Sequence, residues 1–183
     1  NVSFYNESTN KKNGVSSSRG VDASAVIATL GRMDDVAKAV RMQLKKIGSI
    51  LYMIGERKDE LGASEYYQKL GLLREKKGWL GANVPQADFK KTTQESYALI
   101  DLIDDACILS AHDISDGGLA VCLAEMALGA SADGKIGIEV SLDHENLRFD
   151  KYIFSETGGF AVEVDQENQA SFETFLTEKG IHF

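Results

Sequence analysis

The fold is decided by the stretch Cys107-Ile-Leu-Ser-Ala-His-Asp-Ile-Ser-Asp-Gly-Gly-Leu119. It begins with a short apolar run and continues into a polar turn that ends in two glycines. Leu119, Leu123 and Met126 then recur at helical spacing. The pattern predicts a strand, a tight glycine turn and the N-terminus of a helix.

The turn carries the chemistry of a phosphate site. The first amides of a helix have no partner within it and attract anions, and glycines let a ligand approach the backbone closely. Two carboxylates in the same turn would repel a phosphate unless a divalent cation lay between them. The turn therefore predicts a metal-bridged phosphate or nucleotide site, formed by Asp113, Ser115, Asp116, Gly117 and Gly118.

A purely structural interpretation of the same residues stays open. Ser and Asp are preferred helix caps in proteins of any function, and two glycines can serve a close packing of strand against helix. His112 is more consistent with a residue that orients the turn than with an acid or a base.

Bulk properties exclude several classes of protein. The 183 residues are 43% hydrophobic with a net charge of -8, which suits one globular domain and argues against nucleic acid as the main partner. The sequence contains neither an apolar run of membrane-spanning length nor a signal-peptide pattern. Its two cysteines lack metal-ligand spacing and are too few for a disulfide framework, which predicts a cytoplasmic location.

Strand-like and helix-like segments alternate along the chain. Strands are expected at Ala25–Leu30, Ile50–Ile54, Ile136–Val140 and Phe160–Val164. Besides the helix after the glycine turn, four helices are expected: one opened by Asp34 or Asp35 and ended by Gly48, a short one near residues 62–67, one behind the capping box Thr92-x-x-Glu95, and one capped by Asp165. The interleaving predicts an α/β (α+β) two-layer sandwich, in which a mixed sheet carries helices on one face.

The two ends of the sequence resemble interrupted elements. Asn1–Tyr5 has the composition of a strand interior, and residues 6–20 are polar and rich in Gly and Ser, as in a linker. Residues 180–183 begin a strand-like run and stop. We therefore expect a piece of a larger enzyme.

Four motifs occur in an order that resembles one family. They are Asn1-Val-Ser-Phe-Tyr-Asn-Glu7, Leu61-Gly-Ala-Ser-Glu-Tyr66, Ala111-His-Asp-Ile-Ser-Asp-Gly-Gly-Leu-Ala120 and Phe154-Ser-Glu-Thr157. Together they are similar to the second half of phosphoribosylformylglycinamidine synthase in its small-subunit form, within the aminoimidazole ribonucleotide synthetase superfamily.

The resemblance implies a domain organisation and an activity. Residues 1–5 would be the last strand of a preceding N-terminal-type domain, residues 6–20 a linker, and residues 21–183 a C-terminal-type α/β domain truncated at its end. Such enzymes use ATP and Mg²⁺ to activate the formamide oxygen of formylglycinamide ribonucleotide, and ammonia from glutamine then displaces phosphate. The implied partners are the enzyme's N-terminal domains, a glutaminase subunit and a small accessory subunit.

The resemblance also implies roles for single residues. Asn1 and Asp113 would be magnesium ligands, Ser3 would contact substrate, and Asp113 and Ser115 would contact metal and nucleotide. A substrate role for Ser155–Thr157 rests only on internal pseudo-symmetry, and Gly158-Gly159 departs from the larger residues expected after that turn. No catalytic residue is expected in this chain, because the general base would lie in the N-terminal region.

Two other functions stay open. The nucleotide pocket of this half could be non-catalytic and serve only to stabilise the structure. The chain could also belong to a sister enzyme, such as aminoimidazole ribonucleotide synthetase, selenophosphate synthetase or a hydrogenase-maturation factor.

Overall fold

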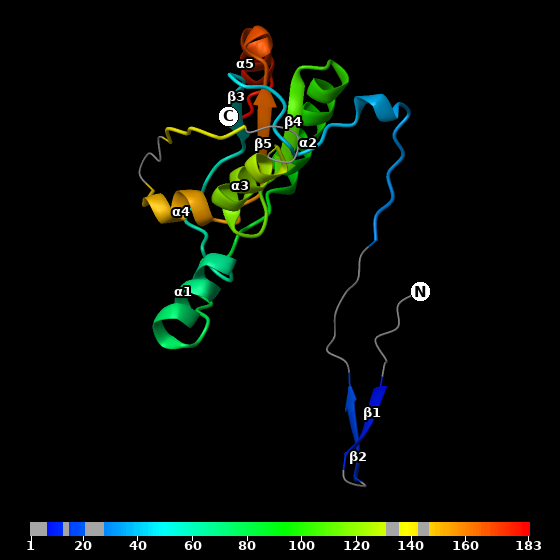
Figure 1. Cartoon of the computed structure of the whole chain (residues 1–183), viewed down its shortest axis with the longest axis vertical. Coiled ribbons are helices and arrows are strands. Elements are labelled where there is room, and N and C mark those ends of the chain that lie inside the picture. The colour runs from blue at the N-terminus through cyan, green and yellow to red at the C-terminus, as the bar shows by residue number, and fades with distance from the viewer. Residues whose placement is uncertain (1–6, 13–14, 21–27, 131–135, 143–146) are drawn as a thin grey trace. The chain divides into compact units, whose positions relative to one another are not determined.

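The computed structural model describes residues 7–12, 15–20, 28–130, 136–142 and 147–183. Contacts divide the chain into two units, Asn1–Asp34 and Asp35–Phe183. The first unit contains an antiparallel hairpin of β1 (Glu7–Lys12) and β2 (Val15–Gly20) (Figure 1). The segment that we expected to be a linker, residues 6–20, thus forms paired strands over most of its length.

The second unit is built on a three-stranded sheet. Its strands are β3 (Ile50–Ile54), β4 (Ile108–Asp113) and β5 (Phe160–Val164), in the order β3-β5-β4. Both pairings are antiparallel, with β5 in the centre. The predictions for β3 and β5 are confirmed at the same bounds.

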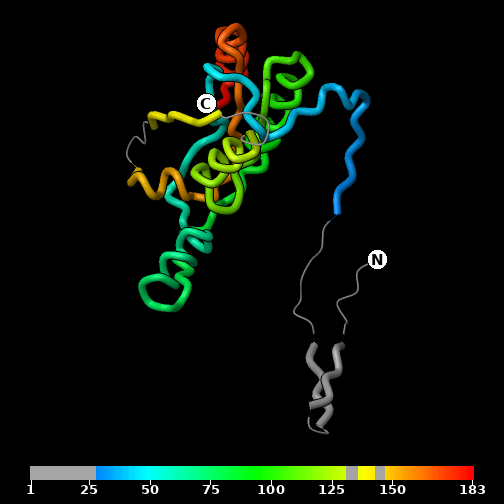
Figure 2. Tube along the Cα trace, in the orientation of Figure 1, coloured from blue at the N-terminus to red at the C-terminus, as the bar shows by residue number. Residues whose placement is uncertain are grey.

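Five α-helices and two 3-10 helices are described in this unit. They are η1 (Val36–Lys38), α1 (Glu65–Glu75), α2 (Phe89–Asp104), α3 (Gly118–Ala130), α4 (Phe149–Phe154), η2 (Gln166–Asn168) and α5 (Gln169–Glu178). The chain leaves β3, runs out through α1 and returns to α2, a path that is followed most easily in the trace of Figure 2.

One face of the sheet packs against α2 and α5. Val162 and Val164 of β5 point to this face and are fully buried. They meet Leu102 from α2 together with Phe172 and Leu176 from α5. Burial of such side chains contributes about 1.5–3 kcal/mol each to stability.

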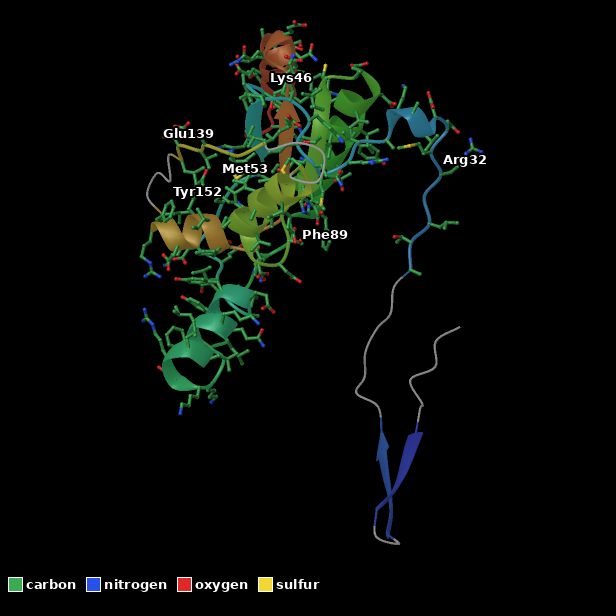
Figure 3. All side chains as sticks on the ribbon, in the orientation of Figure 1. Arg32, Lys46, Met53, Phe89, Glu139 and Tyr152 are labelled. Atoms are coloured by element: carbon green, nitrogen blue, oxygen red, sulfur yellow. The ribbon has the colours of Figure 1, made fainter. Side chains whose placement is uncertain are left out.

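The opposite face packs against α3. Ala161, which directly precedes Val162 in β5 and points to the other face, belongs to a cluster that contains Leu119, Cys122 and Met126 of α3. Met53 of β3 and Tyr152 of α4, both labelled in Figure 3, are partly buried against the same cluster. Helices therefore cover both faces of the sheet.

The α/β class is confirmed, and two of its details need correction. The described strands pair antiparallel throughout, whereas we expected a mixed sheet. Helices lie on both faces rather than on one, because β5 is buried on both sides and α3 is apolar around most of its circumference. The alternation in Phe160–Val164 had indicated only a half-buried strand.

Tertiary hydrogen bonds replace the helix expected between Asp35 and Gly48. Asp35 caps only the short η1. Further on, the amide of Leu44 donates to the Met126 carbonyl, and the amides of Lys45 and Lys46 donate to the carboxylate of Glu163. These donors are then unavailable to a helix.

Three more local expectations differ from the structure. Residues 28–30 form no strand, and residues 25–27 lie outside the described residues. Residues 136–140 form none either, because Ile136 and Ile138 pack against the α3 cluster without a partner strand. Helix α2 begins at Phe89, one turn before the expected capping box, because Asp88 accepts hydrogen bonds from the amides of Lys90 and Lys91.

None of the helices in the described ranges combines the length and the apolar character needed to cross a bilayer.

Candidate functional site

The candidate site is the turn between β4 and α3. Ile114 anchors it from inside: its side chain is buried and its amide donates to the Gly159 carbonyl at 2.8 Å. Gly117 and Gly118 follow with φ angles of +81° and +67°, which glycine adopts without steric cost. The predicted order of strand, glycine turn and helix is confirmed.

Three polar side chains of the turn face solvent. The Asp113 side chain is 66% exposed, and Ser115 and Asp116 are also exposed. Asp113 is the last residue of β4, so the sheet fixes its backbone position. These side chains are open to a ligand that approaches from outside the chain, although Oδ1 of Asp113 also contacts His112.

Gly117 and Gly118 were expected to face a phosphate, but both are buried. The Gly117 amide donates to Oε1 of Glu156 at 2.8 Å, and the Gly118 amide donates to the Ser115 carbonyl at 2.9 Å. The carboxylate of Glu156 thus occupies the position that we had expected for a phosphate.

Close packing accounts for Gly118. A Cβ at this position would lie 2.6 Å from the Ser155 carbonyl oxygen and 2.7 Å from that of Ile153. Helix α3 can approach the end of α4 this closely only without a side chain here. The packing interpretation therefore fits the two glycines better than the phosphate-binding one.

His112 lies between two carboxylates beside the turn. Its Nδ1 is 3.1 Å from Oδ1 of Asp113, and its Nε2 is 2.8 Å from Oε2 of Glu125 in α3. Its side chain is 13% exposed, so the ring is held in place. This arrangement agrees with an orienting role for His112.

The Phe154–Thr157 turn directs its polar groups inward. The Ser155 hydroxyl is 2.6 Å from the Thr157 hydroxyl, and Thr157 donates to Oε2 of Glu60 at 2.9 Å. Glu156 accepts a second amide, that of Glu65 at the start of α1, at 2.8 Å. Ser155 and Thr157 are buried, so these side chains bind other parts of the chain.

Arg57 completes this turn from the segment after β3. Its guanidinium donates to the carbonyls of Ser155, Thr157 and Gly158. Burial lowers the pKa of Arg57 to about 10. The sequence analysis missed Arg57 and the binding of two backbone amides by Glu156, because the partners of both residues lie far away in the sequence.

Of the two residues expected to hold Mg²⁺, the structure describes Asp113. Asn1, the other expected magnesium ligand, lies outside the described residues, as does Ser3, the expected substrate contact. Within the described ranges, no group of three or more His, Cys, Asp or Glu side chains is arranged to hold a metal ion. Asp113 and Asp116 could take part in binding only where a phosphate and water supplied the remaining oxygens, which is the usual environment of Mg²⁺ in nucleotide enzymes.

Comparison with known families gives a match over most of the second unit. The family described as AIR synthase related protein, C-terminal domain, matches residues 46–183. The chain belongs to this family. The resemblance noted from the four sequence motifs is thereby confirmed.

Individual relatives are similar to nearly the whole chain. Phosphoribosylformylglycinamidine synthase subunit PurL of Methanothrix thermoacetophila is 42% identical over 172 residues, which are 94% of this chain and 20% of the relative. The PurL subunit of Caldanaerobacter subterraneus subsp. tengcongensis is 34% identical over 157 residues, which are 86% and 19%. The chain thus spans about a fifth of the length of the curated relatives that it matches.

Solved structures show the same fold. T. maritima PurL complexed with FGAR matches with a TM-score of 0.61 at 14% identity, covering 80% of this chain and 24% of that chain. PurLQS from Thermotoga maritima matches with a TM-score of 0.54 at 13% identity, covering 80% and 22%.

Proposed function

We propose that this chain forms part of a phosphoribosylformylglycinamidine synthase, an ATP-dependent C–N ligase of purine biosynthesis. The observation that carries the proposal is the 42% identity to a PurL subunit over 94% of this chain. In this reaction ATP activates the formamide oxygen of formylglycinamide ribonucleotide. Ammonia from glutamine then displaces phosphate and leaves the amidine.

Within that enzyme we assign residues 21–183 to a C-terminal-type domain and residues 1–5 to the last strand of a preceding domain. Residues 6–20 connect them and include the hairpin β1–β2. The general base and the rest of the ligand site would belong to other domains of the enzyme.

The chain's own contribution is one wall of the ligand cleft. Asp113, Ser115 and Asp116 are the exposed polar side chains of the β4–α3 turn. When bound there, Mg²⁺ would neutralise phosphate charge, with Asp113 as the residue of the described chain that holds it. His112 keeps the Asp113 carboxylate in one orientation through the 3.1 Å contact.

The proposal includes partners and a location. A ligase of this kind needs the remaining domains of its own subunit, a glutaminase subunit and a small accessory subunit. We place it in the cytoplasm, with no nucleic acid or membrane as partner, in accordance with the net charge of -8.

A segment exchange tests the proposal. The matching fifth of the Methanothrix PurL subunit is replaced by this chain, and formation of the amidine product is measured with ATP, Mg²⁺ and ammonia. We expect the hybrid to form product and to require ATP. A folded hybrid that binds substrate without turnover would contradict the proposal, and a hybrid made with a scrambled α3 segment serves as the inactive control.

A second function is favoured by one observation. The amides of Gly117 and Gly118 and the side chains of Ser155–Thr157 all have partners within the chain, as expected of a half whose role is structural. In that case a nucleotide would remain bound through purification without being consumed. Chromatography of the nucleotide released by acid from the complete enzyme, before and after turnover, distinguishes the two functions.

A further inference from the structure

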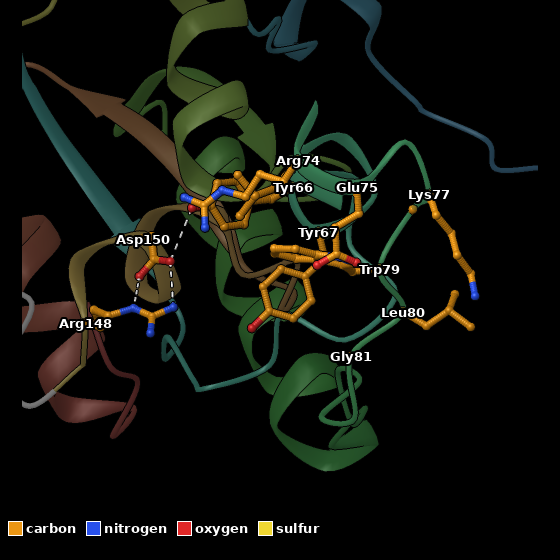
Figure 4. A pocket seen from close by; sticks show the side chains of 12 residues that line it. Tyr66, Tyr67, Arg74, Glu75, Lys77, Trp79, Leu80, Gly81, Arg148 and Asp150 are labelled. Carbon is orange, nitrogen blue, oxygen red and sulfur yellow. Dashed lines mark hydrogen bonds and ion pairs between the residues drawn. The ribbon is translucent and has the colours of Figure 1, made fainter. Parts of the chain in front are cut away.

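A hollow of about 820 Å³ lies between α1, the loop that follows it and the start of α4 (Figure 4). Its described lining shares no residue with the turn at residues 113–118. The hollow is therefore a separate feature, and it needs its own explanation.

One wall of the hollow is a fixed polar and aromatic network. The Tyr66 ring stacks on Phe154, with ring centres 4.5 Å apart, and its hydroxyl donates to Asp150 at 3.3 Å. Asp150 also accepts two hydrogen bonds from Arg148, at 2.5 and 2.8 Å. The negative charge of Asp150 is thus balanced within the wall.

The opposite wall is formed by Trp79 and its neighbours. The Trp79 ring meets Tyr67 edge to face, with centres 6.2 Å apart, and the Arg74 guanidinium lies 5.9 Å from the Trp79 ring centre. The Trp79 amide donates to the Tyr67 carbonyl and fixes the loop to α1.

Two glycines give the hollow its preset shape. A Cβ at Gly71 would lie 2.5 Å from the Lys77 carbonyl oxygen, so only glycine lets the loop lie on α1. Gly81 has φ +68°, and a Cβ there would lie 2.8 Å from the Tyr67 ring. A rigid recess of this kind loses little entropy when it binds a partner.

The segment around the hollow carries a net positive charge, whereas the chain as a whole is negative. Residues 65–81 contain four Lys or Arg and two Glu, whereas the whole chain has a net charge of -8. Within the described residues, Arg74 and Lys77 form no ion pair, and Glu75 is an acid without a salt bridge. Leu73 and Leu80, 83% and 77% exposed, lie on the same helix and loop.

We propose that this hollow docks an acidic, aliphatic segment of another protein chain. Tyr, Trp and Arg dominate the energetically important parts of protein interfaces, and they line this hollow. Aliphatic side chains of the segment pack on Tyr67, Trp79 and Leu80, and its carboxylates pair with Arg74 and Lys77. A small anion fits less well, because the hollow lies at the C-terminal end of α1, whose carbonyls repel compact negative charge.

Trp79 is the only tryptophan of the chain, so its emission reports directly on the hollow. The probe is a short synthetic peptide in which Glu alternates with Leu. We expect a saturable change in Trp79 emission, and saturable anisotropy with a labelled copy of the peptide. Peptides with Lys in place of Glu, or Ser in place of Leu, should not saturate either signal.

Four variants locate the binding. Lys77→Glu and Leu80→Ser should each weaken peptide binding by about threefold to tenfold. Glu75→Gln should strengthen it, because it removes the unpaired acid. Lys90→Glu is the matched control, a charge reversal on an exposed residue of α2 outside the hollow, and it should leave binding unchanged. Circular dichroism confirms that each variant is folded.

Three results would overturn the proposal. The first is an unchanged Trp79 emission at saturating peptide, and the second is equal binding by Lys77→Glu and the parent chain. The third is the full Trp79 response with inorganic phosphate or ATP alone, which would identify a small-anion site instead.

Discussion

At Gly118 the backbone has φ +67°, and the Ser155 carbonyl oxygen lies only 2.6 Å from the position that a Cβ would take. Gly118→Ala should lower the free energy of unfolding by about 3 kcal/mol, from backbone strain and overpacking together. Gly158→Ala is the matched control: it has open space around the new methyl group and should change stability by less than about 0.5 kcal/mol. Urea unfolding measures both, and equal stabilities would disprove the packing role of Gly118.

Cys122, buried in α3, gives a prediction for alkaline pH. Burial raises the pKa of its thiol to about 12, and the carboxylates of Asp113 and Glu125 add to the shift. As pH rises, the thiol of the unfolded chain loses its proton before the thiol of the folded chain does. The protonated Cys122 therefore makes its full contribution to the free energy of unfolding below about pH 9, and this contribution is lost as pH rises toward 12.

The expected loss by pH 10.5 is about 1–2 kcal/mol relative to a chain without this thiol. Urea midpoints measured from pH 8 to pH 10.5 should fall less steeply in Cys122→Ala than in the parent chain. Cys107→Ala, at the partly exposed cysteine, is the control for removal of a thiol. Parallel slopes in parent and Cys122→Ala would contradict the assignment.

At the scale of elements, Glu156 joins the starts of two helices. Its Oε1 accepts the amides of Glu65 in α1 and Gly117 before α3, each at 2.8 Å. Glu156→Gln keeps an acceptor and should cost about 1 kcal/mol, whereas Glu156→Ala should cost about 2 kcal/mol or more. Thermal unfolding gives both values, and an Ala variant as stable as the parent would show that the helices do not depend on this carboxylate.

Glu163 holds the segment before β3 against the sheet. Its fully buried carboxylate accepts the amides of Lys45 and Lys46 and the hydroxyls of Ser49 and Ser110. Glu163→Leu leaves the amides of Lys45 and Lys46 without acceptors and should cost about 3 kcal/mol. Hydrogen exchange should show faster exchange at Lys45 and Lys46, and unchanged protection there would contradict this account.

Elements defined by local pattern were predictable from the sequence. The apolar run Ile50–Ile54, the alternation in Phe160–Val164 and the glycine turn before α3 each depend on neighbouring residues, and the structure has them at those places. Elements set by distant partners were not predictable. Leu44 would suit a helix, yet the amides from Leu44 to Lys46 are bound by Met126 and Glu163, far away in sequence.

In the candidate site, too, features that depend on neighbouring residues were predictable and features that depend on distant partners were not. The exposure of Asp113 and Ser115 could be predicted, because these residues lie at and just after the end of a strand. The hydrogen bond from the Gly117 amide to Glu156 could not be predicted, because the two residues are 39 positions apart in the sequence. A carboxylate from the chain itself can fill an anion site, and the sequence of the turn alone cannot reveal it.

For the whole molecule, the domain organisation of the relatives limits what the chain does alone. It spans about a fifth of their length. In the function proposed above, the exposed β4–α3 turn would form a complete ligand site only with other domains. The acidic β4–α3 turn and the basic residues around the hollow, Arg74 and Lys77, lie on different parts of the second unit. We therefore expect the ligand-facing turn and the hollow beside α1 to respond to separate substitutions.

The most direct test is Asp113→Asn in the complete enzyme that contains this chain, with turnover and melting temperature measured on the same preparation. Because Asp113 is the proposed magnesium ligand, we expect turnover with Mg²⁺ and ATP to fall by about a hundredfold. Because its side chain is 66% exposed, we expect the melting temperature to stay unchanged. Asp105→Asn, an exposed carboxylate after α2, should change neither quantity. Retained turnover with a lowered melting temperature in Asp113→Asn would contradict the account and assign this half of the enzyme a structural role.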